Sequence, residues 1–316
     1  MIRLLFSLLA CWQLSVSGQS FSVLSYNCEN AFDTIDTPRH ADEAFLPDGE
    51  YHWTRFRFSR KINRIAQVIL AADSLKPLDI AILQEVETDT VLTALLRRTP
   101  LASLGYEYAM TDSRDARGIN VAIVYSPYTF HPISRQVIGL DSAYLAHKHL
   151  TPTRDILYLA GTLPTGDTLH VYALHLPSRL GGAEAATKRR EILRRLSQHI
   201  DSLYTVHPQP RVLVAGDFNE GPTRQLKTLL PQLEGLMYGL PEGSYKYRAN
   251  WEWIDQMWVS RPFFSVEKAY PRTLRLPPLL EEDASYGGTK PFRTYRGPTY
   301  LGGYSDHLPV VLHVNL

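Results

Sequence analysis

The side chains that could carry chemistry are concentrated in five short segments, each of which adjoins an apolar run. In chain order these segments are Ser25-Tyr26-Asn27, Leu83-Gln84-Glu85-Val86, Leu174-His175-Leu176-Pro177-Ser178, Ala215-Gly216-Asp217-Phe218-Asn219 and Ser305-Asp306-His307-Leu308-Pro309. The first four follow an apolar run and the last precedes one. Active sites of sheet proteins are often assembled from strand ends and the loops that follow them. We therefore expect the five segments to converge on one site.

Three of these residues offer oxygen ligands of the kind that hard divalent cations prefer: Asn27, Glu85 and Asp306. Mg²⁺ and Mn²⁺ accept one or two carboxylates and complete their shell with water and substrate phosphate. The chain has two cysteines, Cys11 and Cys28, which are too few to build a zinc cluster from thiolates. The expected cofactor is Mg²⁺, with Mn²⁺ as the alternative.

A candidate proton acceptor stands directly beside a candidate metal ligand, because His307 follows Asp306. A histidine with a pKa of about 6.5 can take a proton from water at neutral pH. It needs an orienting acceptor, and Asp255 is the candidate, although this carboxylate could pair with Arg248 instead. Three further residues could surround a phosphoryl group, by donating to its nonbridging oxygens or by handling the proton of the leaving group: His175, Asp217 and Asn219.

The elements that must position these residues are short strands and longer helices. Runs rich in β-forming residues predict strands at Phe21–Tyr26, Asp79–Leu83, Asn120–Tyr125, Ile156–Gly161, Leu169–Leu174, Val212–Ala215, Ile254–Val259 and Val310–Val314. Helical patterns occur at Phe58–Asp73, Thr88–Arg98, Glu184–Tyr204 and Thr223–Leu230. Within Lys61–Ile69 the apolar residues recur at steps of three and four, as one buried helix face requires. Strands mixed with helices predict an α/β protein with sheets covered by helices.

The chain shows no internal repeat and no low-complexity linker, so we expect one domain over residues 19–316. Two polar stretches rich in Pro and Gly, Asp33–Gly49 and Pro277–Gly303, are expected to be long loops. Loops of that length inside a compact domain are usually functional or mobile.

The N-terminal residues 1–18 have the pattern of a secretory signal peptide. Met1-Ile2-Arg3 is followed by a mostly apolar run, Leu4–Leu14, and then by the small residues Ser15-Val16-Ser17-Gly18. The apolar run is too short to span a bilayer. A buried first strand or helix is the alternative, and a lipoprotein anchored through Cys11 is a further, less favoured one. We expect the protein to be secreted or periplasmic.

The overall charge gives no indication of a polyanionic partner, because Lys and Arg number 33 against 32 Asp and Glu in 316 residues. One local basic run, Lys188–Arg195 on the predicted helix Glu184–Tyr204, is either a solvated helix face or a track for phosphates. Five aromatic residues could stack on bases or pack in the core: Tyr245, Tyr247, Trp251, Trp253 and Trp258.

The candidate residues stand in the order that is typical of the endonuclease/exonuclease/phosphatase superfamily, which the whole chain from Phe21 onward resembles. The motifs that carry the resemblance are Asn27, Gln84-Glu85, His175, Gly216-Asp217-Phe218-Asn219, Asp255 and Ser305-Asp306-His307. This resemblance implies a deoxyribonuclease I-like four-layer α/β/β/α sandwich, in which two packed mixed sheets are flanked by helices and the metal site lies at one rim.

The resemblance also implies a role for each site residue. Glu85 is the principal metal ligand, with Asn27 and Asp306 nearby. His307, paired with Asp255, activates or orients the attacking water. His175 contacts the phosphate. Asp217 and Asn219 stabilise the transition state.

The sequence departs from the nucleases of this group before the strand at Asn120, where a Tyr or Glu is common. Here the residues are Asp115-Ala116-Arg117. Arg117 and Arg154 could bind the substrate phosphate instead. We expect a Mg²⁺-dependent phosphoesterase that cleaves phosphodiester bonds in nucleic acid. The alternatives are a phosphodiesterase acting on phospholipid or sphingomyelin head groups, a phosphomonoesterase, and a non-catalytic binding protein on the same scaffold.

Overall fold

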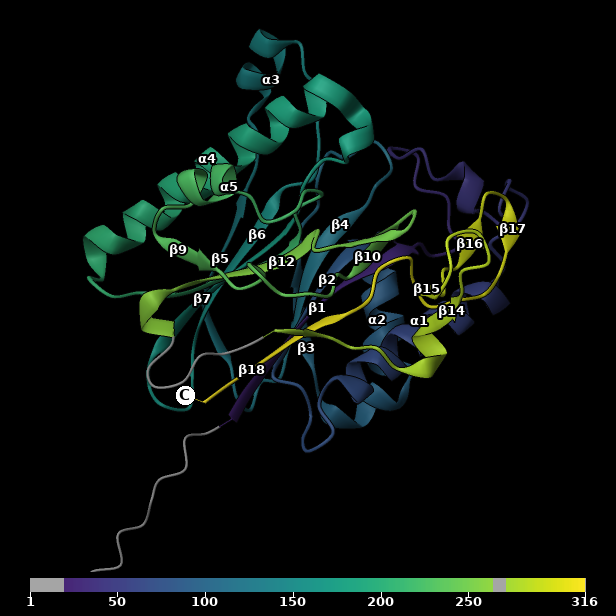
Figure 1. The fold of residues 1–316 in the computed structure, drawn as a ribbon, viewed down its shortest axis with the longest axis horizontal. Helices are drawn as coiled ribbons and strands as arrows, with labels where there is room; N and C mark the ends of the chain where they lie inside the picture. The colour runs from purple at the N-terminus through teal and green to yellow at the C-terminus, as the bar shows by residue number, and fades with distance from the viewer. Residues whose placement is uncertain (1–19, 264–270, 316) are drawn as a thin grey trace, which may run out of the picture.

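The structure is a computed structural model that describes residues 20–263 and 271–315. The predicted signal peptide and Cys11 lie outside the described residues. Two six-stranded sheets pack against each other, and helices lie on the outer faces of both (Figure 1). The prediction of a four-layer α/β/β/α sandwich is therefore confirmed.

The first sheet has the strand order β13-β18-β1-β2-β4-β3. Its strands are β1 (Ser20–Ala31), β2 (Ile80–Val86), β3 (Glu107–Met110), β4 (Asn120–Tyr125), β13 (Arg272–Thr273) and β18 (Val310–Asn315). Strands β1 and β2 are parallel, and their other neighbours are antiparallel, so the sheet is mixed.

The second sheet has the order β5-β6-β7-β8-β12-β9. Its strands are β5 (His131–Ile138), β6 (Ile156–Thr162), β7 (Thr168–His175), β8 (Arg211–Asp217), β9 (Leu233–Gly235) and β12 (Asp255–Ser260). Strands β7 and β8 are the parallel pair of this sheet. Buried aliphatic residues of both sheets form the central core, among them Val23, Ile82, Val171 and Leu213.

In the described part of the chain, five α-helices cover the sheets. Apolar residues of α1 (Arg55–Ala72) and α2 (Asp89–Arg97) pack on the first sheet. The second sheet is covered by α3 (Ser142–Lys148), α4 (Gly182–Val206) and α5 (Arg224–Leu229). The described short 3₁₀ helices are η1 (Glu43–Phe45), η2 (Pro100–Leu104), η3 (Arg179–Gly181), η4 (Arg261–Phe263) and η5 (Pro277–Leu279).

Three small hairpins stand outside the two main sheets. They pair β10 (Tyr245–Tyr247) with β11 (Asn250–Glu252), β14 (Leu280–Glu282) with β15 (Thr289–Pro291), and β16 (Tyr295–Arg296) with β17 (Thr299–Tyr300). The expectation that Pro277–Gly303 is a loop was therefore wrong in part, because two hairpins and η5 lie within it. Strands of two or three residues are too short to show an alternating pattern in a sequence.

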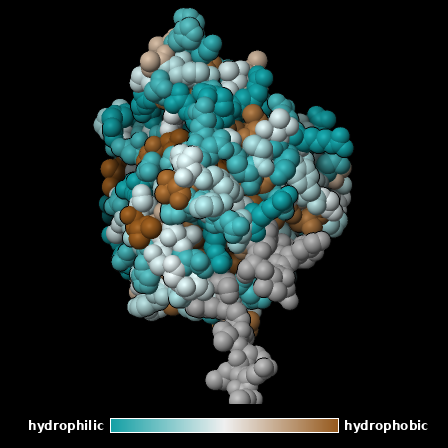
Figure 2. All heavy atoms as spheres, turned by 90° about the vertical axis from the view of Figure 1, so that its left-hand side faces the viewer, coloured by the Kyte–Doolittle hydropathy of each residue, from teal (hydrophilic) through white to brown (hydrophobic). Residues whose placement is uncertain are grey.

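Strand β5 and helix α3 were also not predicted. Nearly every residue of β5 is exposed, so the apolar alternation that marks a half-buried strand is missing. Helix α3 has seven residues and buries one of them, Leu145. Among the described helices, none has the length and hydropathy that a membrane span requires. The face at the left of Figure 1 is mainly hydrophilic, with its hydrophobic residues in small separate groups (Figure 2).

Candidate active site

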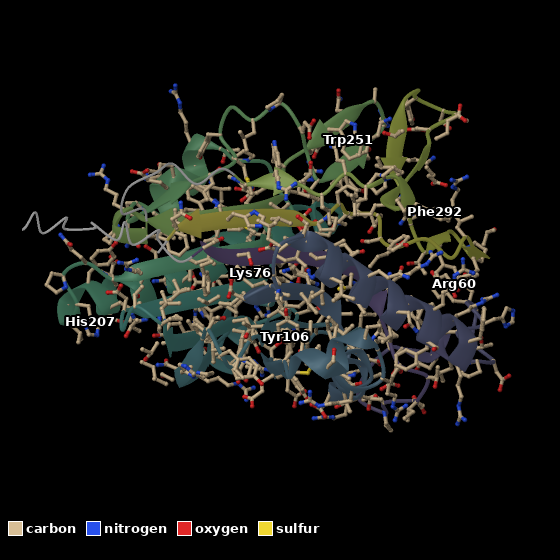
Figure 3. The ribbon with its side chains drawn as sticks, turned by 90° about the horizontal axis from the view of Figure 1, so that it is seen from below. Arg60, Lys76, Tyr106, His207, Trp251 and Phe292 are labelled. Atoms are coloured by element: carbon tan, nitrogen blue, oxygen red, sulfur yellow. The ribbon has the colours of Figure 1, made fainter. Side chains whose placement is uncertain are left out.

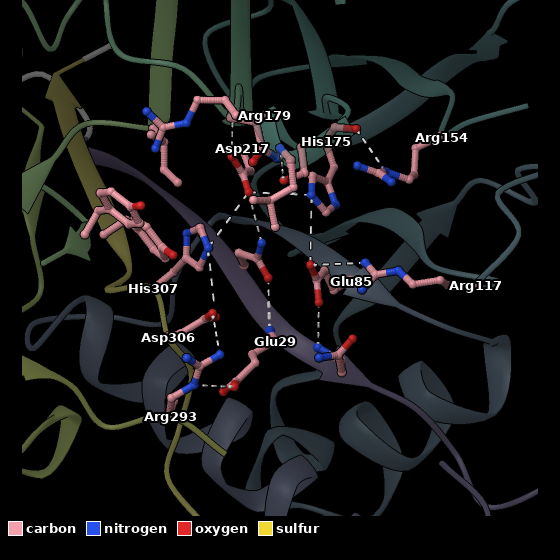
Figure 4. A pocket seen from close by; sticks show the side chains of 18 residues that line it. Glu29, Glu85, Arg117, Arg154, His175, Arg179, Asp217, Arg293, Asp306 and His307 are labelled. Carbon is pink, nitrogen blue, oxygen red and sulfur yellow. Dashed lines mark hydrogen bonds and ion pairs between the residues drawn. The ribbon is translucent and has the colours of Figure 1, made fainter. Parts of the chain in front are cut away.

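Strand register brings the predicted site residues together. Asn27 of β1 lies opposite Gln84 of β2, and His175 of β7 lies opposite Asp217 of β8. Asp255 begins β12 and pairs with Asp217 from the other side. A cleft of about 750 Å³ opens at this rim of the two sheets (Figure 4). It is lined by nine of the ten predicted site residues: Asn27, Glu85, Arg117, Arg154, His175, Asp217, Asn219, Asp306 and His307.

The tenth residue, Asp255, lies buried behind His307. Its Oδ2 atom is 2.8 Å from Nδ1 of His307, and it accepts a hydrogen bond of 2.5 Å from the Ser244 hydroxyl. The alternative pairing of Asp255 with Arg248 is not observed. Burial by itself disfavours a charged His307, but the Asp255, Asp306 and Asp217 carboxylates outweigh it and raise the pKa of His307 well above its usual value.

Asp217 lies between the two histidines of the cleft. Its Oδ2 atom is 3.5 Å from Nε2 of His175 and 3.9 Å from Nε2 of His307. The Asn27 amide donates to Oδ2 at 3.1 Å, and the backbone N–H of Asn219 donates to Oδ1 at 2.7 Å. Burial, followed by the neighbouring Asp255 carboxylate, raises the pKa of Asp217 to about 7.

Glu85 occupies a strained backbone position at the end of β2, with φ of 60°. Its Oε2 atom accepts the backbone N–H of Asn30 at 2.8 Å, and its Oε1 atom is 3.6 Å from Arg117 and 3.9 Å from Nε2 of His175. Burial opposes ionisation, but the Arg117 guanidinium and the Asn30 N–H outweigh it and lower the pKa of Glu85. The side chain is therefore an ionised carboxylate at neutral pH.

The two histidines differ in protonation. Burial, followed by the Arg154 and Arg117 guanidinium groups, lowers the pKa of His175 well below its usual value. Its Nδ1 atom is buried and has no hydrogen-bond partner among the described residues. At neutral pH His175 is therefore uncharged, whereas His307 favours the protonated state.

The two predicted phosphate-binding arginines have different surroundings. Arg154 is largely buried: it pairs with Asp115 at 3.0 Å and donates to the backbone carbonyls of His175 and Leu176. Arg117 is half-exposed and forms an ion pair of 3.6 Å with Glu85. Most donors of Arg154 are thus engaged within the protein, while Arg117 can reach a ligand in the cleft.

Sequence reasoning missed a second group of polar residues in the cleft, which lies beside Asp306. Arg293 donates to Asp306 Oδ2 at 3.1 Å and to Glu29 Oε1 at 3.3 Å, and the backbone N–H of Thr294 donates to Glu29 Oε2 at 2.6 Å. Burial, followed by the Asp306 carboxylate, raises the pKa of Glu29 to about 7. Glu29 follows a predicted strand end two residues after Asn27, which was the available signal, whereas Arg293 lies in the stretch expected to be a loop.

The donor atoms of the cleft fit a hard divalent cation. Glu85 and Asp306 line it together with Asn27, and all three offer oxygen. The carboxylates are also crowded, since those of Glu29 and Asp217 have pKa values near 7 because of burial and neighbouring carboxylates. A cation would relieve this repulsion.

A second set of possible ligand atoms, from Asp217, Asp255 and His307, is also close enough to hold a cation within the described residues. Two of its members already bond to each other, and Asp255 also accepts from Ser244. The set of Asn27, Glu85 and Asp306 offers oxygen alone, which Mg²⁺ prefers, and is therefore the better match for this cation.

The basic run on α4 does not line the cleft. Lys188 pairs with Glu184 at 2.8 Å, and Arg194 pairs with Glu191 at 2.6 Å. Of the aromatic residues, Trp253 and Trp258 are buried, whereas two others line the cleft: Tyr245 and Tyr247. The ring of Tyr245 lies 4.9 Å from that of His307.

Buried His–Asp pairs beside oxygen ligands at one rim of a two-sheet sandwich can support metal-assisted hydrolysis of phosphate esters. The amino-acid sequence matches the Endonuclease/Exonuclease/phosphatase family over residues 22–316, and the chain belongs to this family. Its members are divalent-metal-dependent phosphoesterases. The resemblance seen in the motifs is therefore confirmed, and the chain is a phosphoester-hydrolysing enzyme. No curated protein sequence matches it.

Solved structures share the fold at low sequence identity. An endonuclease/exonuclease/phosphatase family protein from Bacteroides thetaiotaomicron is 20% identical with a TM-score of 0.59, over 94% of this chain and 98% of that one. A mannosyl-6-phosphatase from the same organism is 20% identical with a TM-score of 0.58, over 92% and 98%. D. rerio TDP2 complexed with a single-strand DNA product is 15% identical with a TM-score of 0.57, over 94% and 99%.

Proposed function

We propose that this protein is a secreted, Mg²⁺-dependent phosphodiesterase that cleaves nucleic acid. The observation that carries the proposal is the convergence of Glu85, His175, Asp217 and the Asp255–His307 pair on one cleft. Secretion rests on the signal-peptide pattern of residues 1–18, and Mg²⁺ rests on the oxygen donors. Mn²⁺ is the alternative cation.

Asn27, Glu85 and Asp306 would hold the cation, which when bound offsets the negative charge that develops on the phosphoryl oxygens. The neighbouring side chains supply the remaining stabilisation. Asp255 fixes the ring of His307 through Nδ1, so Nε2 is directed toward Asp217 at 3.9 Å. In this arrangement Nε2 can hydrogen-bond either the attacking water or a phosphoryl oxygen.

Asp217 is placed to accept the proton of the attacking water, because burial and the Asp255 carboxylate raise its pKa to about 7 and its carboxylate lies between the two histidine Nε2 atoms, at 3.5 and 3.9 Å. His175 contacts the phosphate from the opposite side of the cleft. Asn219 holds Asp217 through its backbone N–H and reaches the Leu176 carbonyl with its amide at 2.9 Å. Such preorganised donors and charges are usually the largest source of rate enhancement.

Nucleic acid is the preferred substrate because cations and aromatic rings share the cleft. Arg117 and Arg179 are each about half-exposed there, and Tyr247 is 50% exposed. Arginines bind phosphates, and exposed rings stack on bases. The similar structure of TDP2 with a single-strand DNA product supports the same choice.

A phosphomonoesterase is the second candidate, because a similar structure is that of a mannosyl-6-phosphatase. A substrate panel separates the candidates: plasmid DNA, RNA, sphingomyelin, p-nitrophenyl phosphate and mannose 6-phosphate, each with Mg²⁺ and with EDTA. We expect cleavage of DNA or RNA that EDTA stops and that His307→Ala abolishes. Intact nucleic acids alongside release of choline phosphate or of inorganic phosphate would refute the proposal.

A further inference from the structure

Helix α1 carries a set of arginines on its outer face that the catalytic cleft does not use. The helix contains no Asp or Glu, whereas Arg55, Arg57, Arg60 and Arg64 all extend from its exposed or half-buried positions. None of the four forms an ion pair with any residue in 20–263 or 271–315. The basic run of α4, by contrast, is largely neutralised by neighbouring carboxylates.

This arrangement opposes the stability of the helix. Arg60 and Arg64 are one turn apart, as are Arg57 and Lys61, and like charges at this spacing repel. Arg55 and Arg57 also lie in the first turn, where the positive end of the helix dipole disfavours cations. Burial, followed by the charge of Arg60, lowers the pKa of Arg64. Within the described part of the chain no carboxylate pairs with these arginines to offset the repulsion, so an anionic ligand would relieve it.

A groove of about 510 Å³ runs along this face, and we call it the α1 groove. Its lining includes Phe56, Arg60, Asn63, Arg64, Gln67 and Tyr304. The Arg64 guanidinium lies 4.6 Å from the centre of the Tyr304 ring, and that of Arg57 lies 4.4 Å from the Tyr300 ring. Stacking holds the Arg64 guanidinium flat, and its Nη1 atom is buried without a hydrogen-bond partner among the described residues. The Arg57 guanidinium, by contrast, donates to the Tyr51 carbonyl and the Tyr295 hydroxyl.

The α1 groove and the catalytic cleft lie on opposite sides of one chain segment. Arg293 lines the cleft, while the adjacent Phe292 ring lies 5.6 Å from the Arg64 guanidinium on the groove side. Tyr304 contributes to the groove, and Asp306, two residues later, contributes to the cleft. Figure 3 shows Arg60 and Phe292 at the same end of the molecule.

We propose that the α1 groove binds the sugar-phosphate backbone of the nucleic-acid substrate beyond the bond that is cut. This inference rests on the proposed function and extends it, because it predicts a substrate longer than a single nucleotide. Arg60 and Arg64 both line the groove one helical turn apart, about 6 Å along the axis, so they can contact neighbouring backbone phosphates. The Phe56 ring, which is 70% exposed, favours a strand with accessible bases over a lipid surface.

The test compares two variants that lose the same charge. The first is Arg60→Gln/Arg64→Gln. The control is Arg190→Gln/Arg224→Gln, which removes two exposed arginines of α4 and α5 that form no ion pair within the described residues. Each is made in a His307→Ala background, and binding of a fluorescein-labelled single-stranded DNA oligonucleotide is measured with Mg²⁺ at several salt concentrations. Phosphatidylserine vesicles serve as the second probe.

We expect the α1 variant to bind the oligonucleotide about tenfold more weakly, and the slope of log affinity against log salt to fall in magnitude by about 1.4 for two lost phosphate contacts. The control should bind like its parent. Arg60→Lys/Arg64→Lys should recover much of the affinity, because charge is retained. With His307 intact, Arg60→Gln/Arg64→Gln should hydrolyse bis(p-nitrophenyl) phosphate at the unaltered rate, which also shows that it is folded.

Equal affinities of the α1 variant and the control would overturn the inference, as would α1-dependent binding of vesicles without binding of the oligonucleotide. The proposed function is judged separately by hydrolysis. If the α1 variant binds and cuts the oligonucleotide as the unaltered enzyme does, only the proposed role of the α1 groove is refuted. If the oligonucleotide binds through α1 but the unaltered enzyme never cuts it, the proposed nuclease activity is refuted and the groove remains a binding site.

Discussion

His307 and Asp255 are 52 positions apart in the sequence, yet Nδ1 of the imidazole lies 2.8 Å from Oδ2 of the carboxylate in a buried setting. The contact leaves one free ring nitrogen, Nε2, which faces Asp217 in the cleft. Ser244 donates to the same Asp255 oxygen and holds it in place. The orientation of the imidazole therefore depends on a chain of two hydrogen bonds.

Asp255→Asn tests this chain of contacts. The amide keeps the size of the carboxylate but removes its charge, so the imidazole loses an anionic acceptor and the protonated form loses its electrostatic support. We expect kcat to fall on the order of 10²–10³-fold with KM nearly unchanged. Ser244→Ala removes one hydrogen bond and no charge, so it should lower kcat far less. A kcat within twofold of the unaltered enzyme in Asp255→Asn would exclude the orienting role.

Glu85→Gln tests the cation site by a measurement other than activity. Mg²⁺ should raise the melting temperature of the unaltered protein, because a ligand that binds only the folded state stabilises it. Gln keeps a hydrogen-bond acceptor for Asn30 but removes the ionic ligand, so the Mg²⁺-induced shift should largely disappear. Glu282→Gln, at an exposed position of β14, is the matched control and should keep the shift. Equal shifts in both variants would place the cation elsewhere.

Arg117 and Arg154 should respond differently to replacement by alanine. Arg154→Ala leaves the buried Asp115 carboxylate without its partner, so the free energy of unfolding should fall by about 3–5 kcal/mol. Arg117→Ala removes a half-exposed side chain and should change stability by less than about 0.5 kcal/mol. It should instead raise KM about tenfold, as expected for a lost contact to phosphate. Urea unfolding and steady-state kinetics measure the two effects, and a reversed pattern would contradict the assignment.

His170 should make the stability depend on pH. Burial, followed by the charges of His207 and His199, lowers the pKa of His170 from 6.5 to about 4. Between pH 6.5 and about 4, the unfolded chain therefore binds a proton at His170 that the folded protein does not. The free energy of unfolding is highest above pH 6.5 and falls as the pH is lowered toward 4. The slope from this residue is at most about 1.4 kcal/mol per pH unit.

Urea unfolding at several pH values across this range checks the sign. His170→Gln should flatten the dependence, whereas His131→Gln, at an exposed position of β5, should not. If His170→Gln and the unaltered protein lose stability in parallel on acidification, the dependence arises from other groups.

Much of the site could be predicted because its polar and ionisable residues directly follow runs of strand-forming residues. Asn27, Glu85, His175 and Asp217 each follow such a run, and the ends of parallel strands meet at one sheet edge whatever loops connect them. The same patterns predicted the main helices and strands, because apolar periodicity reflects burial on one face. Exposed β5 had no such pattern, and it was missed.

Partners that depend on distant segments could not be predicted. The sequence left Asp255 with two possible partners, and only the packing of β12 against the segment after Tyr304 selected His307. Glu29 and Arg293 meet across 264 positions, for which no local pattern exists. The arginines of α1 can be read from the sequence. Only the structure shows that no carboxylate of the described residues lies close enough to pair with them.

The order of the motifs in the amino-acid sequence indicated the family and the side chains of the cleft, and the four-layer architecture followed from that family resemblance. Local periodicity predicted the main helices and strands. The tertiary structure decided which side chains are charged and which are engaged. His175 and His307 are the same residue type, yet burial beside arginines lowers one pKa and carboxylates raise the other. Charge states depend on the sum of burial and distances to every neighbour, and those quantities exist only in the folded chain.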